Sequence, residues 1–244
     1  MSVMDPDPTS NVYEPHIGDS RQYMRDIILG VNDGLISTFL LVSGVVGGGM
    51  DATDVLLIGL AGALAGMISM SIGEYLATKA QGEVFDAEIA LEKIHLRDHR
   101  EDEKDQLKEM LANMGLEEPG LDTVVNIIND NDEAMLNMHA ALEFGVVDSE
   151  RRSPFAAAFA SGTLFLAGAA PSIIPFAVFD DTTTSLLAAA VLVGIGLFFV
   201  GAIKTLQTKK RWSTSGLENL ALGLAAGVLS FYVGKGFDWL ITSF

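Results

Sequence analysis

The 244-residue sequence contains no cysteine. This absence excludes a disulfide framework and any thiolate metal site. A bound metal would have to use carboxylate, imidazole, thioether or backbone oxygen ligands, which suit hard and borderline divalent ions. Basic residues are also scarce, because 15 Lys and Arg stand against 32 Asp and Glu, for a net charge of −17. Such an acidic chain repels phosphate, so we expect no nucleic-acid partner.

The first residues lack the features of a signal peptide. The stretch MSVMDPDPTSNVYEPHIGDS is polar and acidic, with neither a basic region nor an apolar one. We expect residues 1–22 to form a disordered acidic tail, and we assign no role to His16.

Long apolar stretches predict membrane-spanning helices, each of which needs about 20 apolar residues. Five stretches qualify: residues 27–49, 55–77, 154–179, 186–203 and 217–240. The last stretch is the weakest candidate, because its uncharged core is short. We therefore predict an all-α polytopic membrane protein. Residues 23–82 would form the first two spans, residues 83–150 a helical domain inserted between the second and third spans, and residues 151–244 the other three spans.

The distribution of Lys and Arg predicts the orientation. The segments MDATD and FDDTTTS between spans contain acids but no base. The opposite side carries the bases Arg21, Arg25, Lys204, Lys209, Lys210 and Arg211. Positive charge marks the cytoplasmic side. We therefore expect a cytoplasmic N-terminus, a cytoplasmic 83–150 domain and an extracytoplasmic C-terminus.

Glycines recur at four-residue spacing inside the predicted spans, in the pairs Gly44 and Gly48, Gly62 and Gly66, and Gly223 and Gly227. Small residues at this spacing let helix backbones approach closely in lipid. The spacing is compatible with a compact bundle or with a dimer interface.

Two ionisable residues lie within the first two predicted spans. The carboxyl group of Asp33 must face a polar cavity or a partner, because exposure to lipid costs at least a few kcal/mol. Burial favours its protonated form and a bound cation favours its charged form, so Asp33 could exchange a proton for a metal. Local capping or pairing is the alternative. Met70 and Glu74 lie one turn apart and could offer a thioether and a carboxylate to a first-row divalent ion. The alternatives are that Met70 is a packing residue and that Glu74 lies at the membrane interface, and only convergence with Asp33 would make a site.

Nineteen of the 32 acids lie between Glu83 and Glu150. We predict one helix from residue 82 to about 111. At 100° per residue, a stripe roughly 80° wide holds acids, histidines and a glutamine and excludes every base. The stripe predicts a cation-binding face and comprises Glu88, Glu92, His95, His99, Glu103 and Gln106.

A second helix, predicted over residues 121–144, places Asp132, His139 and Glu143 on one face, with the last two a turn apart. The predicted metal ligands are thus Glu92, His95, Glu103, Gln106, His139 and Glu143, with Glu88 and His99 as additional ligands. The alternative is an acidic, solvated surface with incidental histidines. A ferritin-like di-iron centre is disfavoured, because only Glu92–His95 supplies a Glu-x-x-His motif.

The sequence resembles the vacuolar iron transporter family from about Arg21 to the C-terminus. The resemblance is carried by DGLISTFLLVSGVVGG, by SMSIGEYLATKAQ, by the helical insertion and by five spans of the same topology. It implies a homodimeric exporter of cytoplasmic Fe²⁺, and often of Mn²⁺, driven by proton antiport. The metal would be cargo, with no resident cofactor.

The resemblance also implies roles for individual residues. Asp33 and Met70 match residues that line the family's transport pathway. Glu92, Glu103 and Glu143 match glutamates of two Glu-x-x-Glu pairs and one Met-x-x-x-Glu pair in the cytoplasmic domain. Three positions depart from that pattern, because His95, Gln106 and His139 replace Glu, Glu and Met. Histidine is an adequate substitute ligand, whereas glutamine is a weak one.

Two other functions compete with iron export. One is an exporter mainly of Mn²⁺, and the other is a membrane-anchored metal sensor or buffer that transports nothing. An enzyme is disfavoured, since the sequence shows no nucleophile–base pair, phosphate-binding loop or zinc-peptidase signature. The acidic composition and the missing targeting sequence favour a prokaryotic, salt-adapted cell. We therefore expect a plasma-membrane protein that works in metal efflux.

Overall fold

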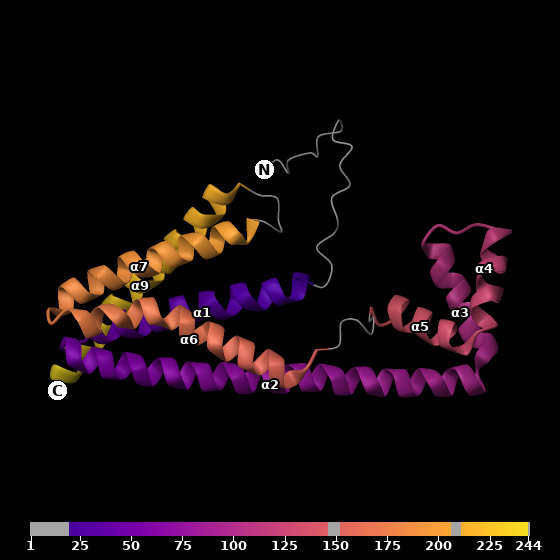
Figure 1. Cartoon of the computed structure of the whole chain (residues 1–244), viewed down its shortest axis with the longest axis horizontal. Coiled ribbons are helices and arrows are strands. Elements are labelled where there is room, and N and C mark those ends of the chain that lie inside the picture. The colour runs from indigo at the N-terminus through magenta and orange to yellow at the C-terminus, as the bar shows by residue number, and fades with distance from the viewer. Residues whose placement is uncertain (1–19, 146–151, 206–210, 244) are drawn as a thin grey trace. The chain divides into compact units, whose positions relative to one another are not determined.

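The computed structural model describes residues 20–145, 152–205 and 211–243. Helices dominate these ranges and no strand occurs within them (Figure 1). The predicted all-α class is therefore confirmed. The predicted tail lies almost wholly outside the described residues, as do Lys209 and Lys210.

The described residues divide into two compact units. The membrane unit comprises Met1–Tyr75 and Phe155–Phe244, and the acidic unit comprises Leu76–Pro154. The membrane unit holds α1 (Ser20–Gly47), the first part of α2 (Ala52–Asp98), α6 (Pro154–Val178), α7 (Thr182–Ile203) and α9 (Trp212–Thr242). The acidic unit holds the rest of α2 with α3 (Arg100–Asn113), α4 (Gly120–Asn129) and α5 (Asp132–Leu142).

Five described helices are long and apolar enough to cross a membrane: Ile27–Gly47 of α1, and α2, α6, α7 and α9. All five predicted spans are thus confirmed as candidate membrane helices, including the fifth, whose helix has 31 residues. Helix α2 has 47 residues, more than twice the roughly 20 that a crossing requires. Its second half therefore lies outside any single crossing.

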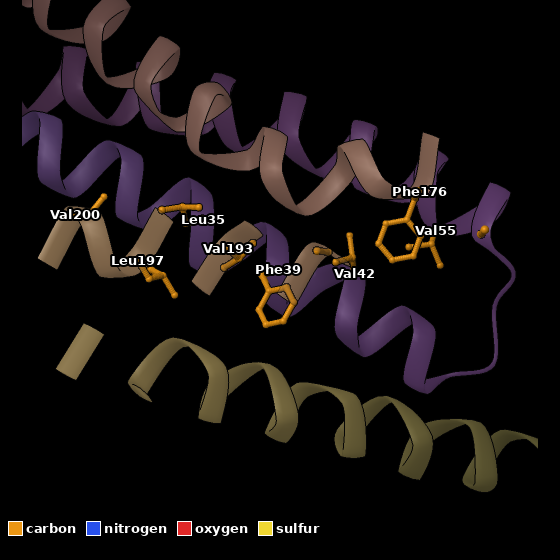
Figure 2. Close-up of a cluster of buried hydrophobic side chains, with 10 residues drawn as sticks. Leu35, Phe39, Val42, Val55, Phe176, Val193, Leu197 and Val200 are labelled. Carbon is orange, nitrogen blue, oxygen red and sulfur yellow. The ribbon is translucent and has the colours of Figure 1, made fainter. Parts of the chain in front are cut away.

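Helix α1 is central to the membrane unit and packs against α7 and α9. Buried side chains from α1, α2, α6 and α7 form one apolar cluster (Figure 2). It includes Leu35, Phe39, Val42, Val55, Phe176, Val193, Leu197 and Val200. Polar contacts add to this packing, because Ser230 Oγ donates to the Leu40 carbonyl across 2.6 Å.

Several glycines of the spans receive side chains or backbone from neighbouring helices of the chain. A methyl group on Gly34 would overlap the Phe165 carbonyl, and one on Gly234 would overlap the Gly44 carbonyl. The glycines of two of the predicted four-residue pairs act similarly. Gly62, Gly66, Gly223 and Gly227 receive the side chains of Leu41, Phe165, Leu197 and Phe39 in turn. These glycines therefore serve packing within the bundle.

The acidic unit folds around a core of Leu96, Leu107, Leu111, Leu121, Val125 and Met135. The predicted single helix over residues 82–111 is wrong. Helix α2 ends at Asp98 and α3 begins at Arg100, because His99 adopts a non-helical φ of −134° and ψ of 34°. The turn brings Leu107 into one core with Leu96. Three acids in the first turn of α3 stabilise the start of that helix.

The second predicted helix, over residues 121–144, also divides in two. Helix α4 ends at Asn129, and α5 begins at Asp132 after the cap residue Asn131. The Asn131 side chain accepts hydrogen bonds from the backbone nitrogens of Glu133 and Ala134, at 2.9 and 3.0 Å. Asparagine is among the preferred residues at this position, so the sequence did carry a signal for the break.

Two basic residues of α3 connect it to α4 and α5. Arg100 pairs with Asp132 at 2.5 Å and donates to the Asn129 side chain at 3.0 Å. Lys108 lies 2.6 Å from Asp122 and 2.9 Å from Glu118, and these carboxylates raise the pKa of its ammonium group. Asp132 is thus engaged by Arg100, although the sequence placed it on the face of His139.

Candidate metal centre and membrane cavity

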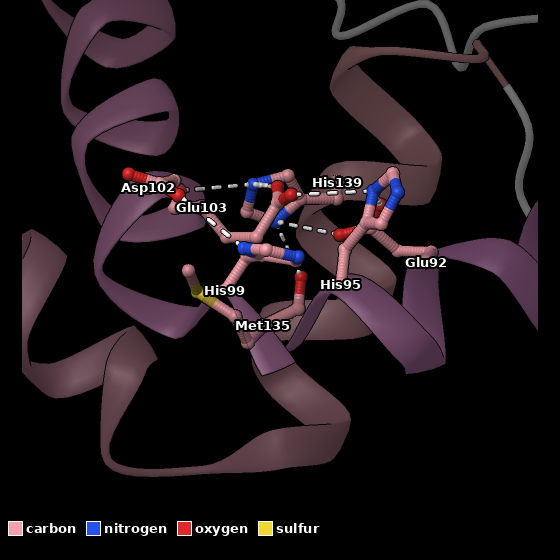
Figure 3. Close-up of polar contacts among 7 residues, drawn as sticks. All are labelled: Glu92, His95, His99, Asp102, Glu103, Met135 and His139. Atoms are coloured by element: carbon pink, nitrogen blue, oxygen red, sulfur yellow. Dashed lines mark hydrogen bonds and ion pairs between the residues drawn. The ribbon is translucent and has the colours of Figure 1, made fainter. Parts of the chain in front are cut away.

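Three helices of the acidic unit bring metal-ligating side chains to one point (Figure 3). Glu92 comes from α2, Glu103 from α3 and His139 from α5, and one ligand atom from each lies within 4.8 Å of the others. All three residues are buried, with exposed fractions of 2%, 6% and 0%. The structure therefore places two carboxylates and an imidazole away from water.

His95 completes a group of four, which we call the Glu–His cluster: Glu92, His95, Glu103 and His139. Its Nδ1 lies 3.3 Å from Glu103 Oε1 and 3.9 Å from Glu92 Oε2. His139 lies between the same carboxylates, with Nε2 3.4 Å from Glu103 Oε2 and Nδ1 3.8 Å from Glu92 Oε1. Around a four-coordinate ion with bonds of about 2.1 Å, ligand atoms lie about 3.4 Å apart. Only one nitrogen of His139 can bind a given ion, and one ligand atom each from Glu92, Glu103 and His139 lies within 4.8 Å of the others, so the side chains would have to draw closer to hold an ion.

His139 lies between two backbone carbonyl oxygens. Its Nδ1 lies 3.0 Å from the Met135 carbonyl oxygen and its Nε2 lies 3.2 Å from the Glu103 carbonyl oxygen. Carbonyl oxygens only accept hydrogen bonds, and a neutral imidazole has a single N–H to donate. A neutral ring can therefore donate to only one of these carbonyl oxygens, and its other nitrogen is left with a free lone pair that a metal could bind. Donation from Nδ1 to Met135 would orient Nε2 toward a metal, as is usual for ligating histidines.

The carboxylates also lack compensation. Among the described residues, Glu92 Oε1 and Glu103 Oε2 are buried without a hydrogen-bond partner. An unsatisfied buried acceptor costs about 1–3 kcal/mol, and more when it is charged. Burial raises the pKa of Glu92, the nearby His139 opposes the shift, and the Glu103 and Glu143 carboxylates add to it. A divalent cation would remove each of these unfavourable terms.

In the metal-free protein, we expect the acidic unit to lose stability as pH rises. The pKa of Glu92 lies above its ordinary value of 4.5, so the unfolded chain loses this proton before the folded chain does. The stabilisation is therefore complete below the ordinary pKa and is lost as pH rises through the raised one. Glu92→Gln should flatten this dependence. Hydrogen exchange of the α5 amides, corrected for intrinsic exchange rates, measures the stability of the acidic unit at each pH in the full chain.

The exposed Glu101 of α3 provides the control, because Glu101→Gln removes an acid near the cluster without changing its buried groups. Identical pH slopes for wild type and Glu92→Gln would show that this carboxyl does not limit stability.

The remaining predicted ligands lie around the cluster. Glu143 is exposed at the C-terminal cap of α5, and its charge acts on Glu92. His99 is exposed, with Nδ1 3.6 Å from Asp102. Glu88 and Gln106 are half-buried, and in the described part of the chain neither makes a hydrogen bond or ion pair with the cluster. The Met135 carbonyl, which the sequence did not single out, holds the imidazole.

A second feature is a cavity of about 360 Å³ in the membrane unit. Helices α1, α2 and α6 supply its lining: Asp33, Ser37, Thr38, Leu41, Gly62, Gly66, Ser69, Met70 and Phe165. The structure thus brings Asp33 and Met70 together. Glu74 is half-buried and does not belong to the lining. Ser69 and Phe165 were not predicted, although a serine beside Met70 in an apolar span was a usable signal.

The fold and these features define a polytopic helical membrane protein that has a buried carboxylate–imidazole cluster and a polar cavity among its candidate spans. Comparison with known proteins identifies the family to which the chain belongs. Residues 24–235 match the VIT family, and the chain belongs to that family. The resemblance seen in the sequence is therefore confirmed.

Three relatives illustrate the similarity. Vacuolar iron transporter 1 of Arabidopsis thaliana is 28% identical over 214 residues, which cover 88% of this chain and 86% of the relative. Vacuolar iron transporter 2 of Oryza sativa subsp. japonica is 30% identical over 217 residues, which cover 88% of this chain and 87% of the relative. Protein CCC1 of Saccharomyces cerevisiae is 28% identical over 223 residues, which cover 86% of this chain and 68% of the relative.

Membership in this family supports metal-ion transport as the activity of the chain. The family consists of transporters, so the prediction that the chain is not an enzyme is confirmed. The metal is accordingly a transported substrate, which the protein carries without using it as a cofactor.

Proposed function

We propose that the chain exports Fe²⁺ from the cytoplasm in exchange for protons. The observation that carries this proposal is the shared cavity of Asp33 and Met70, which come from different helices among the candidate membrane spans. A carboxylate and a thioether together suit a borderline divalent ion. The relatives named as vacuolar iron transporters favour iron as that ion.

Asp33 is the residue we propose for coupling. A carboxyl group in a membrane bundle can be satisfied by a proton or by a cation, and each occupant displaces the other. Ser37, Thr38 and Ser69 add hydroxyl oxygens to the same cavity. Proton entry and metal exit could therefore use one side chain.

The acidic unit would capture the metal through the Glu–His cluster. Two carboxylates balance a divalent charge, and two imidazoles favour first-row transition metals over Mg²⁺ and Ca²⁺. We propose Glu143, at the edge of the cluster, as an additional ligand, and His99, Glu88 and Gln106 as outer groups. Export mainly of Mn²⁺ would use the same residues, and carboxylate ligands suit that ion as well.

We further propose that the chain works as a homodimer. Asp33, Ser37 and Ser69 are exposed in the single chain although they lie in candidate membrane helices. Polar groups at such positions are costly against lipid. A second copy that covers this stripe would remove the cost and complete the wall of the cavity.

We place residues 83–150 and 204–212 in the cytoplasm and residues 51–54 and 180–184 outside, on the basis of the Lys and Arg distribution. We expect the membrane to be a prokaryotic plasma membrane, although the vacuolar relatives in plants are eukaryotic. The chain has no cysteine, so single cysteines report sidedness cleanly. Ser213→Cys should react only with reagent from the cytoplasmic side, and Thr183→Cys only from outside. External labelling of Ser213→Cys would overturn the orientation.

Proteoliposomes test the transport itself. Purified protein should move Fe²⁺, and to a degree Mn²⁺, when a pH gradient is imposed, and metal flux should cause a matching proton flux. Zn²⁺ tests selectivity, and protein-free liposomes give the background. The competing function, a sensor or buffer, predicts metal binding without flux. Binding by the cluster together with background flux for all three ions would favour that alternative.

A further inference from the structure

The lining of the cavity changes from polar to apolar along α1. Asp33, Ser37 and Leu41 follow one another at four-residue spacing, which places them on one face. Eight residues of helix, or about 12 Å, separate Asp33 from Leu41. Helix α2 follows after a short connection and contributes Ser69 and Met70, then Gly66 and finally Gly62. The polar groups thus lie toward one end, and Leu41 with Gly62 lies at the other.

Two bulky side chains of the lining contact glycines of α2. The Leu41 side chain occupies the space that a Cβ on Gly62 would need, and the Phe165 ring similarly occupies the space at Gly66. Two bulky side chains are therefore seated on glycines of α2 that lie about one turn apart. Val42 and Val55, which lie further toward the 48–51 connection, are fully buried members of the apolar core.

The two side chains differ in their freedom to move. Phe165 is 5% exposed and its carbonyl lies directly against Gly34. Leu41 is 37% exposed in the single chain, so its side chain is less tightly enclosed by this chain than Phe165 is. Because Gly62 has no side chain, Leu41 can leave and re-enter this position without displacing another group.

We propose that Leu41, seated on Gly62, is the gate that closes the cavity toward the 48–51 connection. This inference rests on the proposed transport function. A narrow apolar segment excludes water, and it thereby blocks both hydrated ions and proton transfer. A cation held near Asp33 can leave in that direction only after Leu41 swings away from α2. Phe165 forms the fixed floor against which this gate closes.

Proton leakage in the absence of metal tests the gate. Leu41→Ala in proteoliposomes should make an imposed pH gradient decay about tenfold faster than wild type, which corresponds to about 1.4 kcal/mol. Gly62→Ala should also leak, because its methyl group displaces Leu41 while the leucine itself remains. Leu64→Ala is the matched control, since it removes the same side chain from an exposed part of α2 and should decay at the wild-type rate.

A labelling experiment tests the same gate without an imposed pH gradient. A single Val45→Cys, one turn beyond Leu41, should resist a membrane-impermeant thiol reagent supplied only from the Asp33 side of the cavity in otherwise wild-type protein, and should react with it in the Leu41→Ala background. Wild-type decay rates for both Leu41→Ala and Gly62→Ala, with unchanged labelling, would overturn the gate. That result would leave metal transport by wild type intact. Absence of metal flux in wild type would instead overturn the proposed function, whatever the leakage.

Discussion

Asp33→Asn is expected to abolish metal flux driven by a pH gradient while the protein still folds and binds metal. Asparagine keeps the shape of the side chain and much of its hydrogen bonding, but it cannot alternate between neutral and charged forms. Among the described residues, the cavity would then lose the one carboxyl group in its lining. Flux of Fe²⁺ into proteoliposomes should fall to the level of protein-free liposomes, whereas equilibrium binding by the Glu–His cluster should match wild type.

Asp54→Asn is a suitable control, because Asp54 is an exposed acid in the first turn of α2 and does not line the cavity. It should transport at the wild-type rate. Unchanged flux in Asp33→Asn under the same gradient would make the Asp33 carboxyl structural and would move the search for the coupling residue to Glu74.

The second large effect is expected at Glu103. Glu103→Gln removes one carboxylate that faces both histidines, at 3.3 Å from His95 and 3.4 Å from His139. Even groups that only support a metal ligand contribute 10- to 100-fold to affinity, so losing a direct ligand should weaken binding by about 100-fold or more. The fold should persist, because the substitution also removes a buried charge. Calorimetry on full-length Asp33→Asn protein would isolate this cluster from the membrane cavity.

Glu101→Gln, two residues earlier on α3 and exposed, should bind metal like the parent protein. His95→Ala should lose less affinity than Glu103→Gln, because its side chain is 39% exposed and water can take its place. Equal affinities for parent and Glu103→Gln would exclude the cluster as the capture site.

The candidate spans could be read from the sequence, because an uninterrupted apolar run needs no tertiary information to mark a membrane helix. The acidic unit could be read only in part. Its helical character and its candidate ligands followed from periodicity, but the break at His99 has no glycine or proline to mark it. That break forms because it lets Leu107 and Leu111 join Leu96 in a core, which is a long-range effect. The break at Asn131 was visible as a helix cap but was missed.

These breaks explain which site residues were predicted well. Glu92 and His95 share α2, so helical spacing alone related them correctly. The same spacing, continued through a helix that actually ends at Asp98, grouped His99 and Gln106 with them. Helical spacing does not explain why Glu103 belongs to the site. Helix α3 leaves the His99 turn in a new direction, and this direction brings Glu103 close to Glu92. The sequence indicated Met70 and Asp33 separately as residues of a transport pathway. Only the packing of α1, α2 and α6 places both in the lining of one cavity.

Burial of the Glu–His cluster sets a limit on the speed of metal exchange. His139 is fully enclosed and Glu92 nearly so, so an ion cannot reach them by diffusion through open solvent. Half-exposed His95 offers the first contact, and the ion reaches the buried ligands when the unit opens locally around them. Loading and unloading then proceed no faster than this local opening. If every exported ion passes through the cluster, the opening frequency of a small helical unit, and not the membrane step, is the ceiling on turnover.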